Sequence, residues 1–206
     1  MIPRGRFITL EGIDGAGKST QLDFIADLLR GHGAELVQTR EPGGTTLGEE
    51  LRKLVLHQPM TPRAETLIVF AARAQHLAAV VEPALAAGKW VLCDRFTDAT
   101  YAYQGGGRGV ADDEIAALER WVHAALQPDL TLLFDVPPEV AAARIAGTRA
   151  ADRFEREQTR FFERVRAVYL ARARQYANRF VVIDGTLDAP AVQRFVEEKL
   201  QRWLTP

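Results

Sequence analysis

Nine residues near the N-terminus, with the sequence GIDGAGKST, combine three glycines, a lysine and two hydroxyl side chains. Because glycines lack Cβ atoms, successive backbone N–H groups can turn toward one point and form a concave site for anions. Gly12, Gly17, Lys18 and Ser19 have the spacing of a loop that binds nucleotide phosphates. In such a loop Lys18 bridges the β- and γ-phosphates, and the Ser19 hydroxyl binds a magnesium ion. The full pattern favours this interpretation over the alternative, a glycine-rich turn before a helix.

The residues on either side of this loop support its interpretation as a phosphate site. An apolar run at 7–10 predicts a strand, and leucine and isoleucine at helical spacing over 22–29 predict a helix. A helix that begins at the loop directs its positive N-terminal dipole toward a bound phosphate. We therefore expect the whole loop to contact ATP, through Gly12, Ile13, Asp14, Gly15, Ala16, Gly17, Lys18, Ser19 and Thr20.

Short apolar runs alternate with longer amphipathic stretches along the chain, which predicts an α/β fold with a mainly parallel sheet and helices on both faces. We expect five strands, at 6–11, 34–39, 90–94, 129–135 and 179–184. Helices are expected near 18–30, 47–56, 64–86, 112–126, 138–146, 155–177 and 189–203. No linker or repeat divides the sequence, so we expect a single domain over 1–206.

Chemically active side chains follow the other predicted strands, at the edge where open parallel sheets bind ligands. The second strand is followed by TREPGGT, which contains Arg40, and the third by Asp94 and Arg95. Asp94 is placed to accept a hydrogen bond from magnesium-bound water, and Arg95 to bind a phosphate. Taken singly, these segments could be a Pro-Gly turn and a salt bridge. Their coincidence with the phosphate loop favours a common site.

The segment ARIAGTRAADRFERE lies beyond the fourth strand and places Arg144, Arg149 and Arg153 around a Gly-Thr break. We interpret it as a short lid, at about 144–155, whose arginines arrive with the nucleotide. A solvated charged helix face is the alternative. A lid arginine would add positive charge at the transferred phosphoryl group.

The composition restricts the possible partners and compartment. The 206 residues carry a formal net charge of -1, which gives no general attraction to nucleic acid or acidic membranes. A single cysteine, Cys93, cannot form an internal disulfide, and the four histidines have no metal-binding spacing. The N-terminus has no apolar segment typical of a signal peptide, and no run of about 18 apolar residues occurs. We therefore expect a cytoplasmic protein without nucleic-acid or membrane partners.

Six segments together resemble the bacterial thymidylate kinases: GIDGAGKST, TREPGGT, FAARAQH, DRF, TYAYQGGGRG and DRFE. They occur in this order between about residue 6 and residue 184, and the pairing of REPGG with YQGGG is the most specific part. The resemblance implies a P-loop kinase fold that forms a homodimer. It also implies transfer of the γ-phosphoryl group of ATP, with Mg²⁺, to dTMP, giving dTDP for dTTP synthesis.

The resemblance implies that nine residues bind the acceptor: Asp14, Arg40, Pro42, Phe70, Arg73, Arg95, Thr100, Tyr103 and Gln104. Two arginines, Arg40 and Arg95, would hold the acceptor phosphate, and Asp14 would bond the 3′-hydroxyl. At the base, Arg73 would donate to thymine O4 while Phe70 stacks on the ring. Thr100 and Gln104 would complete the contacts with the base edge, and Tyr103 would crowd the 2′ position against ribonucleotides.

Two positions depart from the pattern of many relatives. The stacking phenylalanine often lies four residues before Arg73, where this chain has Val69; Phe70 lies three before it, on a neighbouring part of the same helix face.

Some members carry an arginine in the phosphate loop, but position 16 is Ala. This resembles the subtype in which the lid supplies the cation, so we expect Arg149 or Arg153 to act with Lys18, Arg95 and Mg²⁺.

Other kinds of nucleotide-binding protein fit the sequence less well. A deoxynucleoside kinase has an acceptor without a 5′-phosphate and would not need two phosphate-binding arginines. A GTPase switch would carry an Asn-Lys-x-Asp motif for guanine, which is absent. A structural protein with a degenerate ATP site would not need intact Lys18, Ser19 and Asp94. A thymidylate kinase remains the preferred prediction.

Overall fold

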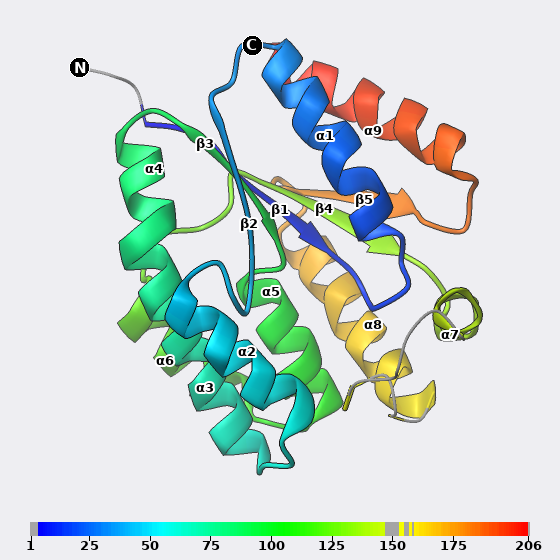
Figure 1. Cartoon of the computed structure of the whole chain (residues 1–206). Helices are drawn as coiled ribbons and strands as arrows, with labels where there is room; N and C mark the ends of the chain where they lie inside the picture. The colour runs from blue at the N-terminus through cyan, green and yellow to red at the C-terminus, as the bar shows by residue number, and fades with distance from the viewer. Residues whose placement is uncertain (1–3, 147–152, 155–156, 158, 206) are drawn as a thin grey trace.

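A computed structural model describes residues 4–146, 153–154, 157 and 159–205 of the chain (Figure 1). Five parallel strands form one sheet in the order β2-β3-β1-β4-β5. Their bounds are β1 Phe7–Glu11, β2 Leu36–Arg40, β3 Trp90–Asp94, β4 Leu130–Asp135 and β5 Phe180–Asp184. The predicted parallel sheet with helices on both faces is confirmed, and each strand begins within two residues of its expected position.

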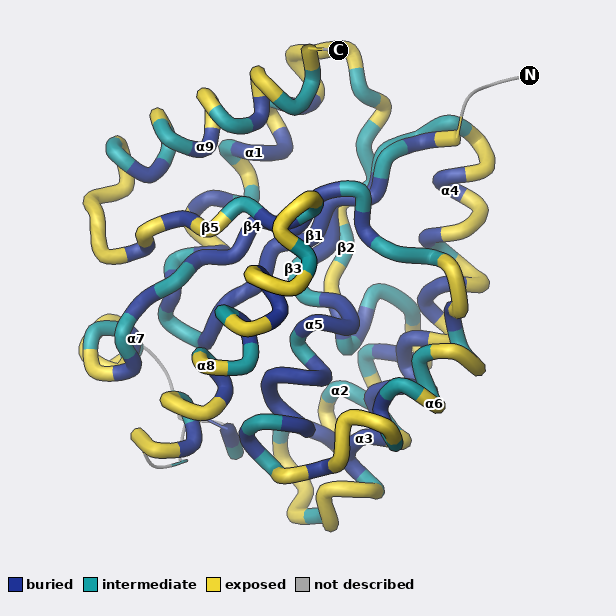
Figure 2. The backbone as a smooth tube through the Cα atoms, turned by 180° about the vertical axis from the view of Figure 1, so that it is seen from behind, coloured by how far each residue is buried: buried dark blue, intermediate teal, exposed yellow. Residues whose placement is uncertain are grey.

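The burial of the central strands explains why their sequences are continuous runs of mainly apolar residues. Every residue of β1 is buried, and β3 and β4 are buried over most of their length, whereas the edge strands β2 and β5 are partly exposed (Figure 2). A strand covered on both faces by helices gains from apolar side chains at every position. β1 lies at the centre between β3 and β4, so the loop that follows it emerges in the middle of the sheet edge.

Helices cover the two faces unequally. On one face, α1 (Lys18–Gly31) packs on β1, β2 and β3 and against α9 (Ala189–Leu204) (Figure 1). The opposite face and the carboxyl edge of the sheet carry the remaining helices, whose first members are α2 (Thr46–His57) and α3 (Pro62–His76). The others are α4 Glu82–Ala86, α5 Thr97–Thr100, α6 Asp112–Val122, α7 Pro138–Ile145 and α8 Thr159–Gln175.

Helix α3 continues through a π-helical turn, Leu77–Val81, into α4, so that one helical stretch spans Pro62–Ala86. Its length and composition would suffice to cross a membrane. Half of its most apolar window is buried inside the fold, however, and its buried residues include Leu77 and Val81 of the core. The stretch therefore packs as a core helix of this fold.

The sequence did not predict the helical segment formed by α5 and the π-helix Tyr101–Gly107 that continues it. Three consecutive glycines at its end disfavour a helix by intrinsic propensity. Packing against α8 explains them: a Cβ on Gly107 would lie 2.4 Å from the Phe161 ring. The glycines let the two backbones approach closely, and this contact outweighs local propensity.

A buried ion-pair cluster joins α5 to α8 and to the turn before β5. The Asp98 carboxylate is 1% exposed and accepts from Arg172 Nε at 2.5 Å and from Arg179 Nη1 at 2.8 Å. Its desolvation opposes ionisation, but the two guanidinium groups outweigh this effect and lower the pKa of Asp98. The cluster holds the helix that carries several of the predicted acceptor-binding residues.

Replacing Asp98 should test how strongly this cluster fixes α5. Asp98→Ala leaves two guanidinium groups without their buried partner, so we expect the free energy of unfolding to fall by about 3–5 kcal/mol. Glu50→Ala removes an exposed carboxylate paired with Lys53 and should change it by less than about 0.5 kcal/mol. Urea unfolding of both variants measures the difference. Equal, small losses would contradict a structural role for the cluster.

Candidate active site

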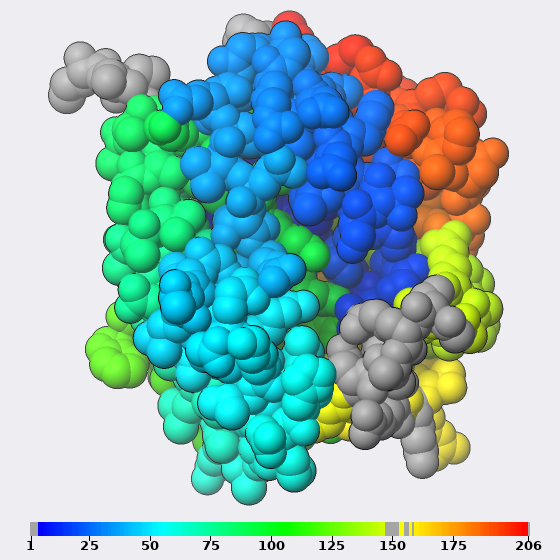
Figure 3. All heavy atoms as spheres, in the orientation of Figure 1, coloured from blue at the N-terminus to red at the C-terminus, as the bar shows by residue number. Residues whose placement is uncertain are grey.

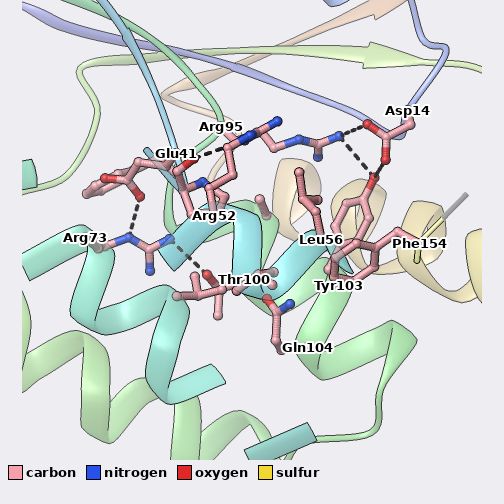
Figure 4. A pocket seen from close by; sticks show the side chains of 15 residues that line it. Asp14, Glu41, Arg52, Leu56, Arg73, Arg95, Thr100, Tyr103, Gln104 and Phe154 are labelled. Carbon is pink, nitrogen blue, oxygen red and sulfur yellow. Dashed lines mark hydrogen bonds and ion pairs between the residues drawn. The ribbon is translucent and has the colours of Figure 1, made fainter. Parts of the chain in front are cut away.

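A cavity opens at the carboxyl ends of β1, β2 and β3, bordered by α2, α3 and the α5 segment (Figures 3 and 4). Charged and polar side chains gather at its two ends, and aliphatic ones lie along its walls. Its lining consists of Asp14, Glu41, Pro42, Arg52, Val55, Leu56, Val69, Arg73, Arg95, Phe96, Ala99, Thr100, Tyr103, Gln104 and Phe154.

The phosphate loop follows β1 beside this cavity and has the backbone form that its glycines allow. Gly12 has φ of 136°, and a Cβ there would lie 2.4 Å from the Phe134 carbonyl oxygen. Lys18 is buried at the start of α1, and its Nζ donates to the carbonyl oxygens of Gly12 and Ile13 at 3.1 and 3.2 Å. Burial, with the nearby Arg95 charge, lowers the pKa of Lys18. An anion bound in the loop would compensate this desolvated cation.

Arg95 connects the phosphate loop to the cavity. Its guanidinium donates to Asp14 Oδ1 at 2.8 Å and to the Tyr103 hydroxyl at 3.1 Å, and Tyr103 donates in turn to Asp14 Oδ2 at 3.1 Å (Figure 4). Desolvation opposes ionisation of Asp14, but the charges of Arg95 and Lys18 outweigh it and lower the pKa of Asp14 to about 2. This end of the cavity therefore holds an ionised carboxylate and a cation at neutral pH.

Arg73 is the main donor at the other end of the cavity. The residue is 1% exposed; its Nε donates to Glu41 Oε2 at 2.7 Å, and Nη2 donates to Thr100 Oγ1 at 2.9 Å (Figure 4). Its remaining nitrogen, Nη1, is buried without a hydrogen-bond partner among the described residues. An unsatisfied buried N–H costs free energy, which a ligand that accepts a hydrogen bond would recover.

Glu41 and His76 fix the position of Arg73. The carboxylate of Glu41 is 2% exposed and contacts His76 Nδ1 at 2.9 Å, and His76 Nε2 lies 2.7 Å from Thr39 Oγ1. Burial opposes ionisation of Glu41, but the Arg73 charge and the His76 contact outweigh it and lower the pKa of Glu41. These partners leave the Arg73 guanidinium little freedom to turn.

Gln104 lies near the same end and has its amide orientation set by Glu65. Its Nε2 donates to Glu65 Oε1 at 2.7 Å, and Glu65 is fully buried. Because the carboxylate can only accept, the amide nitrogen faces Glu65 and the carbonyl oxygen is left for the cavity. This end of the cavity thus offers a donor on Arg73 and an acceptor on Gln104.

Asp94 has the properties of a residue that binds a divalent cation through water or directly. It ends β3, and its Oδ1 is buried without a hydrogen-bond partner among the described residues. Ser19, in the first turn of α1, exposes its side chain. No three His, Cys, Asp or Glu side chains in the described part of the chain are grouped to hold a metal. These oxygen donors fit Mg²⁺, provided that nucleotide phosphates supply further ligands.

The chain is similar to known proteins over nearly its whole length. A family model described as thymidylate kinase matches residues 10–196. The chain belongs to the thymidylate kinase family. It is 59% identical over 201 residues to the thymidylate kinase of Bordetella petrii, covering 98% of this chain and 97% of the relative. It is 59% identical over 195 residues to that of Cupriavidus metallidurans, covering 95% and 97%.

A solved structure agrees with this assignment. The crystal structure of thymidylate kinase from Ehrlichia chaffeensis matches with a TM-score of 0.79 and 35% identity, covering 97% of this chain and 99% of that one. The P-loop kinase fold that the resemblance implied is confirmed. As a member of the thymidylate kinase family, the chain is a nucleoside monophosphate kinase.

Most of the acceptor-binding residues that the resemblance to thymidylate kinases implied lie around one cavity. They come from the phosphate loop, from the segment after β2, from α3 and from the segment after β3. These residues are Asp14, Pro42, Arg73, Arg95, Thr100, Tyr103 and Gln104. The roles of the individual residues stay predictions.

Phe70 lies outside the cavity, contrary to expectation. Its ring is buried in a cluster with Tyr101, Val110 and Ile115, and Val69 lines the cavity in its place. Successive residues on a helix point about 100° apart, and here the direction of Val69 is the one that meets the cavity. The Arg73 guanidinium carbon lies 4.8 Å from the Phe70 ring centroid. Phe70 therefore packs against Arg73, and the expectation that it stacks on a base is wrong.

Arg40 also lies elsewhere than expected. Its side chain is 52% exposed and pairs with Glu49 in the first turn of α2, with Nη2 to Oε2 at 2.8 Å. The cavity is lined instead by Arg52, one turn further along α2, which donates to the Pro42 carbonyl oxygen at 3.0 Å. Arg52 has no motif signal of its own in the sequence. Only the direction of α2 brings it to the cavity.

The structure pairs Arg153 with Glu65 and with the backbone of α2. Its guanidinium pairs with the buried Glu65 and donates to the Val55 carbonyl oxygen at 3.2 Å, and its backbone N–H donates to Leu56 O at 3.1 Å. A buried carboxylate requires cationic partners, and Arg153 supplies one. In this arrangement Glu65 holds the Arg153 guanidinium, and the role of Arg153 at the transferred phosphoryl group stays a prediction. Arg149, the other expected lid arginine, and most of the lid at 144–155 lie outside the described residues.

Glu11, which the motifs did not single out, is fully buried at the end of β1. Its Oε1 accepts from the Phe96 backbone N–H at 2.7 Å, and its Oε2 accepts from the Tyr169 hydroxyl at 2.8 Å. Burial, with the nearby Asp98 charge, raises the pKa of Glu11 to about 8, although the Arg95 charge acts in the opposite direction. The sequence shows only a carboxylate after an apolar run, which indicates none of these contacts.

The raised pKa of Glu11 gives a testable pH dependence of stability. A folded-state value of about 8, against an ordinary value of 4.5, means that folding favours the protonated acid. This contribution is complete below pH 4.5 and is lost as the pH rises through 8. Between pH 5 and 8.5, the free energy of unfolding should fall by about 4 kcal/mol more in the wild type than in Glu11→Gln. Parallel pH curves from urea unfolding would contradict it.

Proposed function

We propose that the cavity binds dTMP and the phosphate loop binds ATP, so that the γ-phosphoryl group passes to the dTMP 5′-phosphate and yields dTDP and ADP. The single observation that carries the acceptor assignment is the buried, unpartnered Nη1 of Arg73 in a cavity that ends at Arg95. A nucleoside monophosphate has a base with acceptor atoms at one end and a phosphate at the other. The two arginines match these two ends.

The base end of the cavity discriminates thymine by hydrogen-bond polarity. Thymine presents an acceptor at O4, which suits Arg73, and a donor at N3, which suits the carbonyl oxygen of Gln104. Cytosine presents a donor and an acceptor at the same two positions, so both contacts become unfavourable. Each unsatisfied buried polar group costs about 1–3 kcal/mol. Val69 and Phe96, which also line the cavity, supply apolar contact for the ring.

At the phosphate end, Arg95 and Arg52 bind the acceptor phosphate, and Asp14 bonds the deoxyribose. Tyr103 is held by hydrogen bonds to both Asp14 and Arg95, which fixes its ring beside the sugar. A rigid ring at this position excludes a 2′-hydroxyl. Since Asp14 already neutralises part of the Arg95 charge, the second arginine adds attraction for a dianionic phosphate.

Three residues act on ATP, the phosphoryl donor: Lys18, Ser19 and Asp94. Lys18 contacts the β- and γ-phosphates, while Ser19 and Asp94 hold Mg²⁺, directly or through water. When bound, the metal neutralises charge on the transferred group. Phosphoryl transfer requires alignment and charge neutralisation more than covalent chemistry, so these residues and Arg95 supply most of what the protein contributes. Arg149 is proposed as the lid cation.

A panel of acceptors tests this assignment. With ATP and Mg²⁺, dTMP should exceed dCMP in kcat/KM by about 10²-fold or more, because dCMP mispairs with both Arg73 and Gln104. A coupled assay of ADP release measures each rate. Lys18→Ala, which removes the cation of the phosphate loop, serves as the inactive control with an unchanged fold. Equal rates with dTMP and dCMP would refute the base assignment.

We further propose that the enzyme acts as a cytoplasmic homodimer and that α3 and α6 form the interface. These helices pack side by side, and Trp121 of α6 and Leu67 of α3 are 82% and 55% exposed. Burial of such side chains against a second copy would remove apolar surface from water. The family resemblance independently implies a dimer.

Sedimentation tests the dimer and its surface together. The wild type should sediment at twice the 22.8 kDa mass of the chain at micromolar concentration. Trp121→Glu should shift the equilibrium toward monomer, because a charge replaces apolar contact area. Leu187→Glu, which changes an exposed apolar residue before α9, is the matched control and should remain dimeric. A monomeric wild type would contradict the proposal.

A further inference from the structure

The carboxylate of Glu11 is fully buried, and none of the ion pairs among the described residues includes it. A buried carboxylate without a direct cationic partner is costly, so its presence requires a reason. Each of its two oxygens is connected to Arg95 through one other residue. One accepts from the backbone N–H of Phe96, which follows Arg95, and the other accepts from the Tyr169 hydroxyl, which contacts the Arg95 guanidinium. We propose that Glu11 is a positioning residue that fixes Arg95, an inference that rests on the proposed role of Arg95 in binding the acceptor phosphate.

The hydrogen bond from the Phe96 backbone to Glu11 helps to hold Arg95 in an unfavourable backbone conformation. Arg95 has φ of 73°, in the left-handed region that non-glycine residues seldom adopt. Hydrogen bonds hold it on both sides: Arg95 N–H donates to Leu10 O at 2.9 Å, and Phe96 N–H donates to Glu11 Oε1 at 2.7 Å. A strained residue persists only where its surroundings determine its conformation. Consecutive residues of β1 provide both acceptors.

The side-chain contact runs through Tyr169, which is 1% exposed in α8. Tyr169 donates its only hydroxyl proton to Glu11 Oε2 at 2.8 Å. Its oxygen is therefore left to accept from Arg95 Nη1, at 3.1 Å. Glu11 thus orients the hydroxyl that supports the guanidinium on the side away from Asp14. The same carboxylate therefore fixes both the backbone conformation at Arg95 and the position of its guanidinium group.

Three variants separate this positioning from a general effect on stability. Tyr169→Phe removes only the hydroxyl, Glu11→Gln removes the charge, and the double variant tests whether the two residues act as one unit. Kinetics at pH 8.5 keep Glu11 mainly ionised, the state in which both oxygens accept. Each single variant should raise KM for dTMP about tenfold and leave KM for ATP within about twofold. The double variant should resemble the single ones, because residues in one network are not additive.

A control of the same chemistry lies outside the site. Tyr101 donates to Glu119 at 2.7 Å and does not line the cavity, so Tyr101→Phe should leave both KM values unchanged. Thermal unfolding of every variant shows whether the fold is retained. Should Glu11→Gln fail to fold, Tyr169→Phe still provides the test.

The results distinguish the inference from the function on which it rests. If Arg95→Ala raises KM for dTMP strongly while folded Tyr169→Phe leaves it unchanged, Arg95 binds the acceptor without help from Glu11 and the inference is overturned. If Arg95→Ala itself leaves KM for dTMP unchanged, the proposed role of Arg95 fails and the inference falls with it. Selective loss of dTMP affinity in both Arg95→Ala and Tyr169→Phe supports both.

Discussion

The contacts of one guanidinium group organise this site. Arg95 follows β3, and its side chain meets Asp14 from the phosphate loop, Tyr103 from the segment after α5 and Tyr169 from α8. Segments distant in the chain thus converge on one cation. A planar guanidinium with several fixed donors suits this task better than an ammonium group. Any ligand phosphate that enters beside Arg95 meets a charge whose position is already determined.

Other buried charges follow the same physical rule. Glu41 with Arg73, Asp98 with Arg172 and Arg179, and Glu65 with Arg108 and Arg153 each satisfy a carboxylate that water does not reach. Such pairs contribute little net stability, because desolvation offsets their attraction, but breaking one is costly. They therefore serve to fix geometry. All three surround the cavity beside the phosphate loop or hold the helix that lines it.

Local charge also explains how a chain with a net charge of -1 can bind highly anionic ligands. Arg95, Arg52 and Lys18 are concentrated at the carboxyl edge of the sheet, beside the N-terminus of α1. Partial burial reduces screening by water and salt, so these cations act strongly on a ligand nearby and weakly elsewhere. The overall charge of the chain is a poor guide to the potential at this edge.

The sequence by itself determined the features that depend on local chemistry. Strand periodicity and the phosphate loop are encoded within a few residues, so the parallel sheet and the place of Lys18 at the start of the first helix could be predicted. Helical spacing placed Phe70 near the usual stacking position of the family, but spacing alone does not fix which way that part of the helix points. The motifs likewise indicated most of the residues that line the cavity.

Only the tertiary structure decided which side chains meet across segments. The choice of Val69 over Phe70, of Arg52 over Arg40, and the pairing of Arg153 with Glu65 depend on how α2 and α3 are rotated against the sheet. Glu11 and Tyr169 are 158 residues apart, and no local pattern relates them. Their contact arises because burial forces each polar group to find a partner, and the nearest partner is set by packing rather than by sequence distance.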